Sequence, residues 1–180
     1  MYGWYAWKRN WTWQRRRSKT KLGQEGENVK EILVVGGGAA GIAAALSAAE
    51  AGGRVTILEG LNRPGKKLLV TGNGRCNLGN TRIAPECYHT ARPDRLKVLL
   101  KQMPATLTTD FFERWGLMTM ADEAGRLYPY CRQASMVVDV LLLALQRRGV
   151  AVETDCTVTE AFWDRGGFTV KSSQGSRWRS

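Results

Sequence analysis

Three glycines, Gly36, Gly38 and Gly41, stand in the spacing G-x-G-x-x-G within the stretch VVGGGAAG. An apolar run precedes them and an alanine-rich run follows, so they lie where a strand would turn into a helix. A helix N-terminus carries unpaired N–H groups and roughly half a positive charge, and both attract phosphate oxygens. The pattern indicates a turn that receives a diphosphate beside the backbone of Gly36, Gly38, Ala39, Ala40 and Gly41.

An acidic residue follows at a spacing typical of dinucleotide sites. Glu59 stands 18 residues after Gly41, at the end of the apolar run RVTILEG. A carboxylate at this place accepts hydrogen bonds from the ribose hydroxyls of an adenosine and repels a 2′-phosphate. The residues therefore favour NAD or FAD over an ordinary glycine-rich turn. They do not choose between the two, because both ligands present an ADP half.

The segment TGNGRCN, Thr71 to Asn77, is a second candidate site, because it has many hydrogen-bonding groups and little to bury. Three kinds of partner could lie against this segment: a metal, a redox partner for Cys76, or an organic ligand. Cysteines at 76, 87, 131 and 156 form no C-x-x-C pair, and His89 is the one histidine, so no metal site is expected.

Cys76 itself has two interpretations. A thiolate beside Arg75 and Lys67 would have a lowered pKa and could exchange electrons with a bound cofactor. No second cysteine lies within a few residues, which argues against a dithiol relay at this loop. The alternative is that Cys76 is a small packing residue, so it is only a weak catalytic candidate.

The elements that would position these residues begin at Val29. KEILVVGG, AAGIAAALSAAEAGG and RVTILEG predict a strand, a helix and a strand, which is the βαβ unit of a parallel sheet. A long polar loop follows from Gly60 to Asn80. DRLKVLLKQM and TTDFFERWG then predict two short helices, the second capped by Thr108, Thr109 or Asp110.

The last third of the chain continues the same alternation. GLMTMADEAGRLYPY predicts a β-hairpin, and RQASMVVDVLLLALQRRG predicts a helix that is apolar on most faces and therefore buried. Residues 150–154 should add a strand to the parallel sheet, and two further strands should be joined at Gly166 and Gly167. No internal repeat is evident.

The charge is concentrated at the start of the chain. The net charge is +11, and residues 1–30 contain eight Lys and Arg against two Glu. The leader, 1–28, is basic and Trp-rich and shows no period, so it is expected to be disordered; its alternative role is to bind phosphates and stack on bases. Residues 32–49 are uncharged but rich in glycine and alanine, which disfavours a membrane span. Free thiols and this composition indicate a cytoplasmic protein.

The sequence resembles a known family at the motifs just described. VVGGGAAGIAAALSAAEAGGRVTILEG and GKKLLVTGNGRCNLGN are similar to the bacterial BaiN-like or aminoacetone oxidase family of NAD(P)/FAD-dependent oxidoreductases. The similarity continues through TDFFERWGL, GRLYPYCRQAS and VVDVLLLALQRRGV, from about Lys30 to Val170. GNGRCN is far more particular to this family than G-x-G-x-x-G. The family often has Phe where this chain has Tyr128, so no catalytic residue is carried over from that segment.

The resemblance implies an α/β fold: a Rossmann-like (GR-type) FAD-binding βαβ unit with a parallel sheet plus a short β-hairpin or meander. It implies FAD as cofactor, with NAD(P)H as a candidate electron donor, and it places Val158 near the adenine. In the family the second loop lies along the FAD. The matching positions here are Lys66, Lys67, Thr71, Gly72, Asn73, Gly74, Arg75, Cys76 and Asn77.

The resemblance implies that family members are much longer than this chain and carry a substrate domain, which we expect this chain to lack. We therefore expect a leader at 1–28, a partial FAD-binding domain at 29–172 and an abrupt tail at 173–180, all in a truncated product. The expected function is the FAD-binding part of an oxidoreductase that acts on an unidentified small molecule. Two alternatives stay open: an NAD-binding dehydrogenase domain, and a non-enzymatic nucleic-acid-binding protein that acts through its leader.

Overall fold

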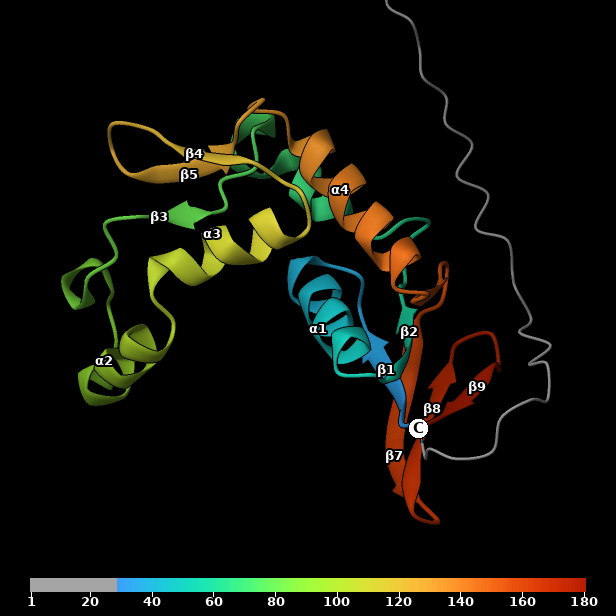
Figure 1. Cartoon of the computed structure of the whole chain (residues 1–180). Helices are drawn as coiled ribbons and strands as arrows, with labels where there is room; N and C mark the ends of the chain where they lie inside the picture. The colour runs from blue at the N-terminus through green and yellow to red at the C-terminus, as the bar shows by residue number, and fades with distance from the viewer. Residues whose placement is uncertain (1–28) are drawn as a thin grey trace, which may run out of the picture.

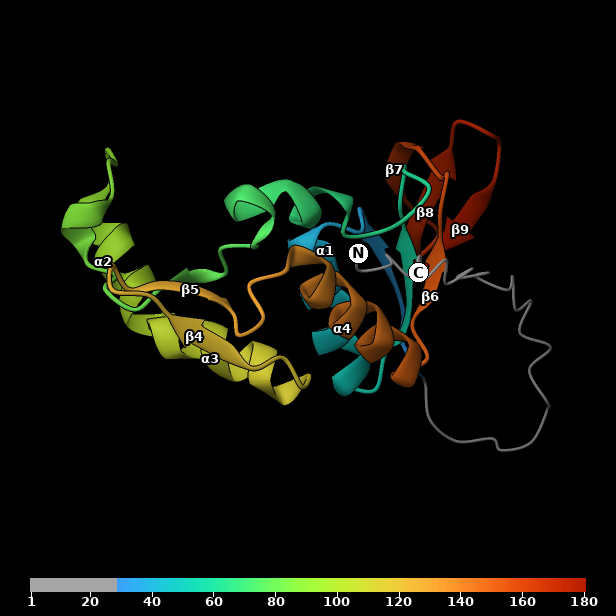
Figure 2. The ribbon, with the colours of Figure 1, turned by 90° about the horizontal axis from the view of Figure 1, so that it is seen from above.

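The computed structural model describes residues 29–180 and has three layers (Figures 1 and 2). The middle layer is a parallel sheet of β1 (Glu31–Val35), β2 (Arg54–Leu58) and β6 (Ala151–Glu153), in the order β1-β2-β6. Helices α1 (Ala39–Glu50) and α4 (Ala134–Arg147) cover one face, and a second sheet covers the other. The expected α/β fold with a parallel sheet is confirmed, whereas the leader interpretation concerns residues outside the described part.

The parallel sheet begins with the βαβ unit that the sequence predicted. β1 pairs with β2 from Glu31 opposite Arg54 to Val35 opposite Leu58, and α1 makes the crossover between them. β6 pairs with the other side of β2, so the strand expected at 150–154 is confirmed. In this order β1 lies at one edge of the sheet. The carboxyl ends of β1 and β2 therefore lie side by side, which brings the glycine turn and Glu59 together.

The main core lies between this sheet and the two helices. Ile42 and Leu46 of α1 and Val137 and Leu145 of α4 have no exposed surface. They pack with Ile57 of β2, whose side chain points to the helical face of the sheet. α4 is buried along one side only, because Met136 and Leu143 remain 43% and 39% exposed. Its composition suggested a helix that is buried on most faces, and the structure shows that one side is exposed.

The second sheet is antiparallel and consists of β7 (Val158–Asp164), β8 (Gly167–Ser172) and β9 (Arg177–Arg179). The two predicted strands are present, and the turn between β7 and β8 falls at Arg165 and Gly166, one residue before the predicted Gly166–Gly167 pair. Val170 packs against Leu58 and Cys156 on the face of the parallel sheet opposite the helices. β9 lies in a segment, 173–180, to which the sequence assigned no element.

The loop after β2 contains structure that the sequence did not reveal. Its main feature is a 3-10 segment, η1 (Lys66–Gly74), with non-helical backbone at Thr71, Gly72 and Asn73. Short 3-10 turns show no apolar period, and the sequence therefore predicted a polar loop here. η1 packs against α4, so the loop is anchored to the main core.

A smaller unit projects from this core at the left of Figure 1. It contains η2 (Pro85–Cys87), α2 (Pro93–Gln102), α3 (Ala105–Arg114) and a sheet of β3 (Gly79–Asn80), β5 (Arg126–Pro129) and β4 (Thr119–Ala121). β4 and β5 form the predicted hairpin. In the described part of the chain, no helix is long and apolar enough to cross a bilayer.

The expected cap of α3 is wrong. The helix begins at Ala105, directly after Pro104, so Thr108, Thr109 and Asp110 lie inside it. Pro104 has extended backbone, with φ −64° and ψ 158°, and therefore starts the helix without a side-chain cap. Proline fixes φ near this value, which substitutes for the conformational role of a capping residue.

Candidate nucleotide-binding site

The strand-to-helix turn between β1 and α1 is built on Gly36 and Gly41. Gly36 has a φ of +94°, a conformation that residues with a Cβ rarely adopt, and its N–H donates to the Leu58 carbonyl over 2.8 Å. A Cβ on Gly41 would collide with the Gly36 carbonyl oxygen. Both glycines are therefore required by the backbone, before any ligand is considered.

The first turn of α1 presents free donors. Ile42 donates to the Gly38 carbonyl over 2.9 Å, and no protein acceptor within 29–180 takes the N–H groups of Gly38, Ala39, Ala40 or Gly41. α1 also has no side-chain cap and no acidic residue in its first turn. A Cβ built on Gly38 would have no atom within 4 Å, so this backbone faces open space. The arrangement fits an anionic ligand.

Glu59 lies against the glycine turn. Its Oε2 accepts the Gly37 N–H over 2.6 Å, and its Oε1 accepts the Leu61 N–H over 2.7 Å. The carboxylate therefore lies beside the start of α1, as a ribose-binding acid requires. Each carboxylate oxygen can accept more than one hydrogen bond, so these contacts leave capacity for ribose hydroxyls.

A second support of the turn was missed in the sequence. The Gly65 N–H donates to the Gly37 carbonyl over 2.7 Å, and Pro64 is fully buried against Gly37. The dipeptide Pro-Gly is a recognisable turn signal, but its spacing from the glycine motif gave no reason to pair them. Lys66 and Lys67 follow this corner and are exposed.

The TGNGRCN segment folds into a tight bend. The Thr71 hydroxyl donates to the Leu68 carbonyl over 2.7 Å, and the Cys76 N–H donates to the Thr71 carbonyl over 3.0 Å. A Cβ on Gly72 would lie 2.6 Å from the Asn77 nitrogen, so the two arms of the bend nearly touch. The bend also includes three exposed residues, Asn73, Gly74 and Asn77.

The two candidate segments lie near each other but are not hydrogen-bonded. Gly65 contacts Val138 of α4, and η1, which contains most of the bend, packs along the same helix. Figure 2 shows η1 at the N-terminal ends of α1 and α4. For the residues described, no hydrogen bond joins Thr71–Asn77 to Gly36–Gly41. α4 is thus the common support of both segments.

Arg75 is held by two contacts. Its Nε donates to the Gly72 carbonyl over 3.3 Å, and its guanidinium stacks on the ring of Tyr128, 5.0 Å from the ring centre. Tyr128 belongs to β5 and is only 4% exposed. Both residues were considered in the sequence analysis, but nothing in the sequence indicated a contact between them.

Cys76 does not have the environment of a reactive thiolate. It is 1% exposed and belongs to the main core. Burial raises the pKa of its thiol, and a hydrogen bond with Thr71 offsets only part of this effect. The lowered pKa suggested by its basic neighbours is therefore wrong, because desolvation outweighs them. The geometry favours the packing role.

Val158 begins β7 next to the end of β2. The Cys156 N–H donates to the Glu59 carbonyl over 2.8 Å, and Thr157 lies beside Gly60. Val158 itself is partly buried against the cluster of Leu58, Cys156 and Val170. The structure thus brings the segment of Val158 to the same edge of the sheet as Glu59.

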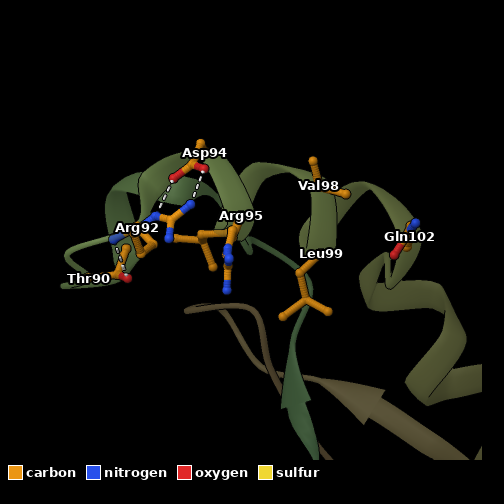
Figure 3. Close-up of a pocket in the computed structure, with 8 residues that line it drawn as sticks. Thr90, Arg92, Asp94, Arg95, Val98, Leu99 and Gln102 are labelled. Carbon is orange, nitrogen blue, oxygen red and sulfur yellow. Dashed lines mark hydrogen bonds and ion pairs between the residues drawn. The ribbon is translucent and has the colours of Figure 1, made fainter.

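A separate groove lies along α2 in the projecting unit, not at the glycine turn (Figure 3). At one end of it Arg92 donates two hydrogen bonds to Asp94, of 3.2 and 2.9 Å (Figure 3). It is lined by Thr90, Arg92, Asp94, Arg95, Leu96, Val98, Leu99 and Gln102. In the described residues, no group of three or more His, Cys, Asp or Glu is placed to hold a metal ion.

Together, the parallel βαβ unit, the free N–H groups of α1 and the neighbouring carboxylate define a Rossmann-type nucleotide-binding domain. Residues 30–180 match the family described as HI0933-like protein Rossmann domain, and the chain belongs to this family. The membership confirms the resemblance found in the sequence, and FAD is the cofactor that this type of domain binds.

Two curated relatives extend the comparison. A 3-dehydro-bile acid delta(4,6)-reductase of Clostridium scindens is 38% identical over 146 residues, which are 80% of this chain and 36% of that protein. A ribosomal RNA dihydrouridine synthase of Escherichia coli is 28% identical over 141 residues, 78% of this chain and 35% of that protein. The chain therefore spans about a third of the length of these relatives.

Solved structures share the fold at low sequence identity. A 3-ketosteroid-delta4-(5alpha)-dehydrogenase from Rhodococcus jostii is similar with a TM-score of 0.58 and 18% identity, over 91% of this chain and 46% of that chain. THI4 of Thermovibrio ammonificans has a TM-score of 0.52 and 14% identity, over 81% of this chain and 48% of that chain. These similarities support the fold assignment.

Proposed function

We propose that this chain is the FAD-binding part of a flavin-dependent reductase. The observation that carries the proposal is the row of free N–H groups from Gly38 to Gly41 beside the carboxylate of Glu59. The free donors would hold the diphosphate, and the carboxylate would hold the adenosine ribose. The protein's part in the reaction is then to bind and orient the flavin, which supplies the hydride when it is bound.

The remaining contacts come from the loop after β2 and from β7. Lys66 and Lys67 supply positive charge, and the open tip of the bend lets a flat ring approach the backbone. The proposed cofactor-contacting residues are Gly36, Gly38, Ala39, Ala40, Gly41, Glu59, Lys66, Lys67, Thr71, Gly72, Asn73, Gly74, Arg75, Asn77 and Val158. Cys76 would support this surface from the core rather than react.

The names of two relatives suggest a substrate class, because each name states a reaction. One reduces a 3-dehydro-bile acid and the other makes dihydrouridine in ribosomal RNA. Both names describe the reduction of a carbon–carbon double bond that is conjugated to a carbonyl group. We propose the same chemistry here: a hydride is added to the carbon distal to the carbonyl, and a proton to the adjacent carbon. NAD(P)H would return two electrons to the flavin.

A titration of the purified full chain tests the cofactor assignment. The fluorescence of FAD should decrease as it binds, and the change should saturate at one equivalent of FAD per chain. NADH alone should bind much more weakly. Saturable NADH binding together with indifference to FAD would support the NAD-dependent alternative instead. Glu59→Ala removes the ribose acceptor together with the acceptor of the Gly37 N–H, so this variant should bind FAD more weakly than the wild type.

Nucleic acid enters as a second candidate through the relatives that act on ribosomal RNA. The basic residues of the leader would then contact RNA phosphates, and its tryptophans would stack on bases. Deleting residues 1–28 should abolish RNA retention without changing FAD binding. Unchanged retention would exclude the leader from this role.

The free cysteines of residues 29–180 suit the reducing cytoplasm that we propose for the protein.

A further inference from the structure

We propose that the corner Pro64–Gly65 is a positioning element that aims the Gly38 N–H at the diphosphate. The inference rests on the proposed function, since it concerns how that site is prepared. Neither residue belongs to the glycine motif, and they follow the end of β2 in the loop that leads into η1. Both residues contact Gly37, the residue between the first two motif glycines.

Both polar groups of Gly37 are bound by protein atoms. Its N–H donates to Glu59 Oε2 over 2.6 Å, and its carbonyl accepts the Gly65 N–H over 2.7 Å. The Gly37 carbonyl would otherwise be free to accept the N–H of Gly41 as the helix continued backwards. Two opposed hydrogen bonds therefore fix the rotation of the peptide groups on either side of Gly37.

This rotation determines where the Gly38 N–H points. The Gly37 carbonyl and the Gly38 N–H belong to one planar trans peptide, so they point in opposite directions. Because the carbonyl points to Gly65, the N–H points away from the corner. A Cβ on Gly38 would also meet no atom within 4 Å, so this residue borders open space from which a ligand can approach.

Packing holds the corner in place. Pro64 is fully buried, and a Cβ on Gly37 would lie 2.7 Å from the Pro64 Cβ, so the two segments touch. Gly65 has a φ of +72°, and a Cβ there would lie 3.2 Å from Cγ1 of Val138 in α4. A side chain at position 65 would thus push the corner away from α4 and disturb its hydrogen bond to Gly37.

Gly65→Ala in the full chain tests the proposal, with ADP and adenosine as probes. ADP carries the diphosphate and adenosine does not, so the ratio of their affinities reports the contact at α1. We expect Gly65→Ala to lower this ratio about tenfold, as expected for loss of a hydrogen bond to a charged group, while the affinity for adenosine stays unchanged. Val138→Ala added to Gly65→Ala should restore part of the ratio, because it makes room for the new methyl group.

Gly149→Ala is the matched control. Gly149 has a similar φ of +68°, but no atom lies within 4 Å of its Cβ position, and it follows α4 at the end remote from the turn. This variant reports the general cost of a Cβ at positive φ and should keep the wild-type ratio. Amide exchange of the unliganded chain gives a readout without ligand: the Gly65 N–H should be protected and the Gly38 N–H should not.

The outcomes separate this inference from the proposed function. An unchanged ADP-to-adenosine ratio in Gly65→Ala, or an equal loss for both probes, overturns the positioning role alone. A Gly65 N–H that exchanges as fast as a free peptide also overturns it. If the wild-type chain does not distinguish ADP from adenosine at all, the proposed nucleotide site is wrong, and the diphosphate role of the corner is lost with it.

Discussion

The guanidinium carbon of Arg75 lies over the ring of Tyr128, 5.0 Å from the ring centre. The two residues belong to different parts of the molecule, the TGNGRCN bend and strand β5 of the projecting unit. Tyr128 is almost fully buried, so its ring is a fixed surface, whereas the arginine side chain on its own would be mobile. The stack therefore fixes one cation at the bend.

Replacing Tyr128 tests the value of this stack. Tyr128→Leu should weaken FAD binding by roughly threefold to thirtyfold, the range expected for loss of a partly buried cation–π contact. Tyr128→Phe keeps the aromatic face and should bind FAD as the wild type does. Equal weakening in both variants would assign the effect to the hydroxyl group instead. Fluorescence titration with FAD measures all three proteins.

Alanine at Gly38 should impair FAD binding, whereas alanine at Gly41 should impair stability. Gly38 has open space at its Cβ position and a φ of −75°, so Gly38→Ala should fold normally but bind FAD at least about tenfold more weakly. Gly41→Ala drives a methyl group into the Gly36 carbonyl and should lower the melting temperature strongly. Thermal unfolding without ligand distinguishes the two, and similar melting temperatures for both variants would contradict the packing argument.

Glu59 should matter for stability even without a cofactor. Its two oxygens each accept a backbone N–H, from Gly37 and Leu61, and a glutamine can satisfy only one of them. Glu59→Gln should therefore destabilise the unliganded chain by about 1–3 kcal/mol. Glu86→Gln is the control, because Glu86 is exposed in η2. Urea unfolding that gives the same stability for both variants would disprove this role.

The buried thiol of Cys76 predicts a loss of stability in alkali. Burial raises the pKa of Cys76 in the folded chain, whereas in the unfolded chain the thiol ionises at its ordinary value of about 8.5. The folded state is therefore fully favoured below that pH, and this contribution is lost as the pH rises through the raised folded pKa. Cys156 adds to the same trend, because burial and then the charge of Glu153 raise its pKa.

Unfolding free energies between about pH 8 and 10 measure this effect. The decline should be smaller in Cys76→Ala than in the wild type, and Cys87→Ala, at an exposed position, should keep the full decline. Alkylation by iodoacetamide at neutral pH should also spare Cys76 and modify Cys87. Rapid modification of Cys76 in the folded chain would reopen its redox interpretation.

The elements with strong periodicity were predictable from the sequence, and those held by distant contacts were not. β1, α1, β2 and α4 have apolar patterns that specify their type, although α4 is apolar on most faces and its sequence did not show which side is buried. β3 and η1 depend on partners far along the chain, β5 and α4. β9 pairs with the neighbouring β8 but is only three residues long, too short to show a pattern. The start of α3 was misplaced because a proline with extended backbone replaces the side-chain cap that the pattern seeks.

The candidate site shows the same division. Gly36, Gly41 and Glu59 follow from spacing alone, because that spacing places Gly36 and Glu59 at adjacent strand ends and Gly41 in the first turn of the helix between the strands. The Gly65-to-Gly37 hydrogen bond and the Arg75–Tyr128 stack depend on tertiary structure and leave no local signal. The ionisation of Cys76 was misjudged for the same reason: neighbours in sequence suggested positive charge, while burial, which only the fold reveals, controls the thiol.

The position of β1 at the edge of the parallel sheet has a practical consequence. In the described residues only β2 pairs with β1, so a row of its N–H and C=O groups faces outward, and Val35 is 57% exposed at its end. An open strand edge is a template onto which any extended segment can add. During expression and concentration of this chain, self-association through that edge should therefore rise with protein concentration, and light scattering would detect it.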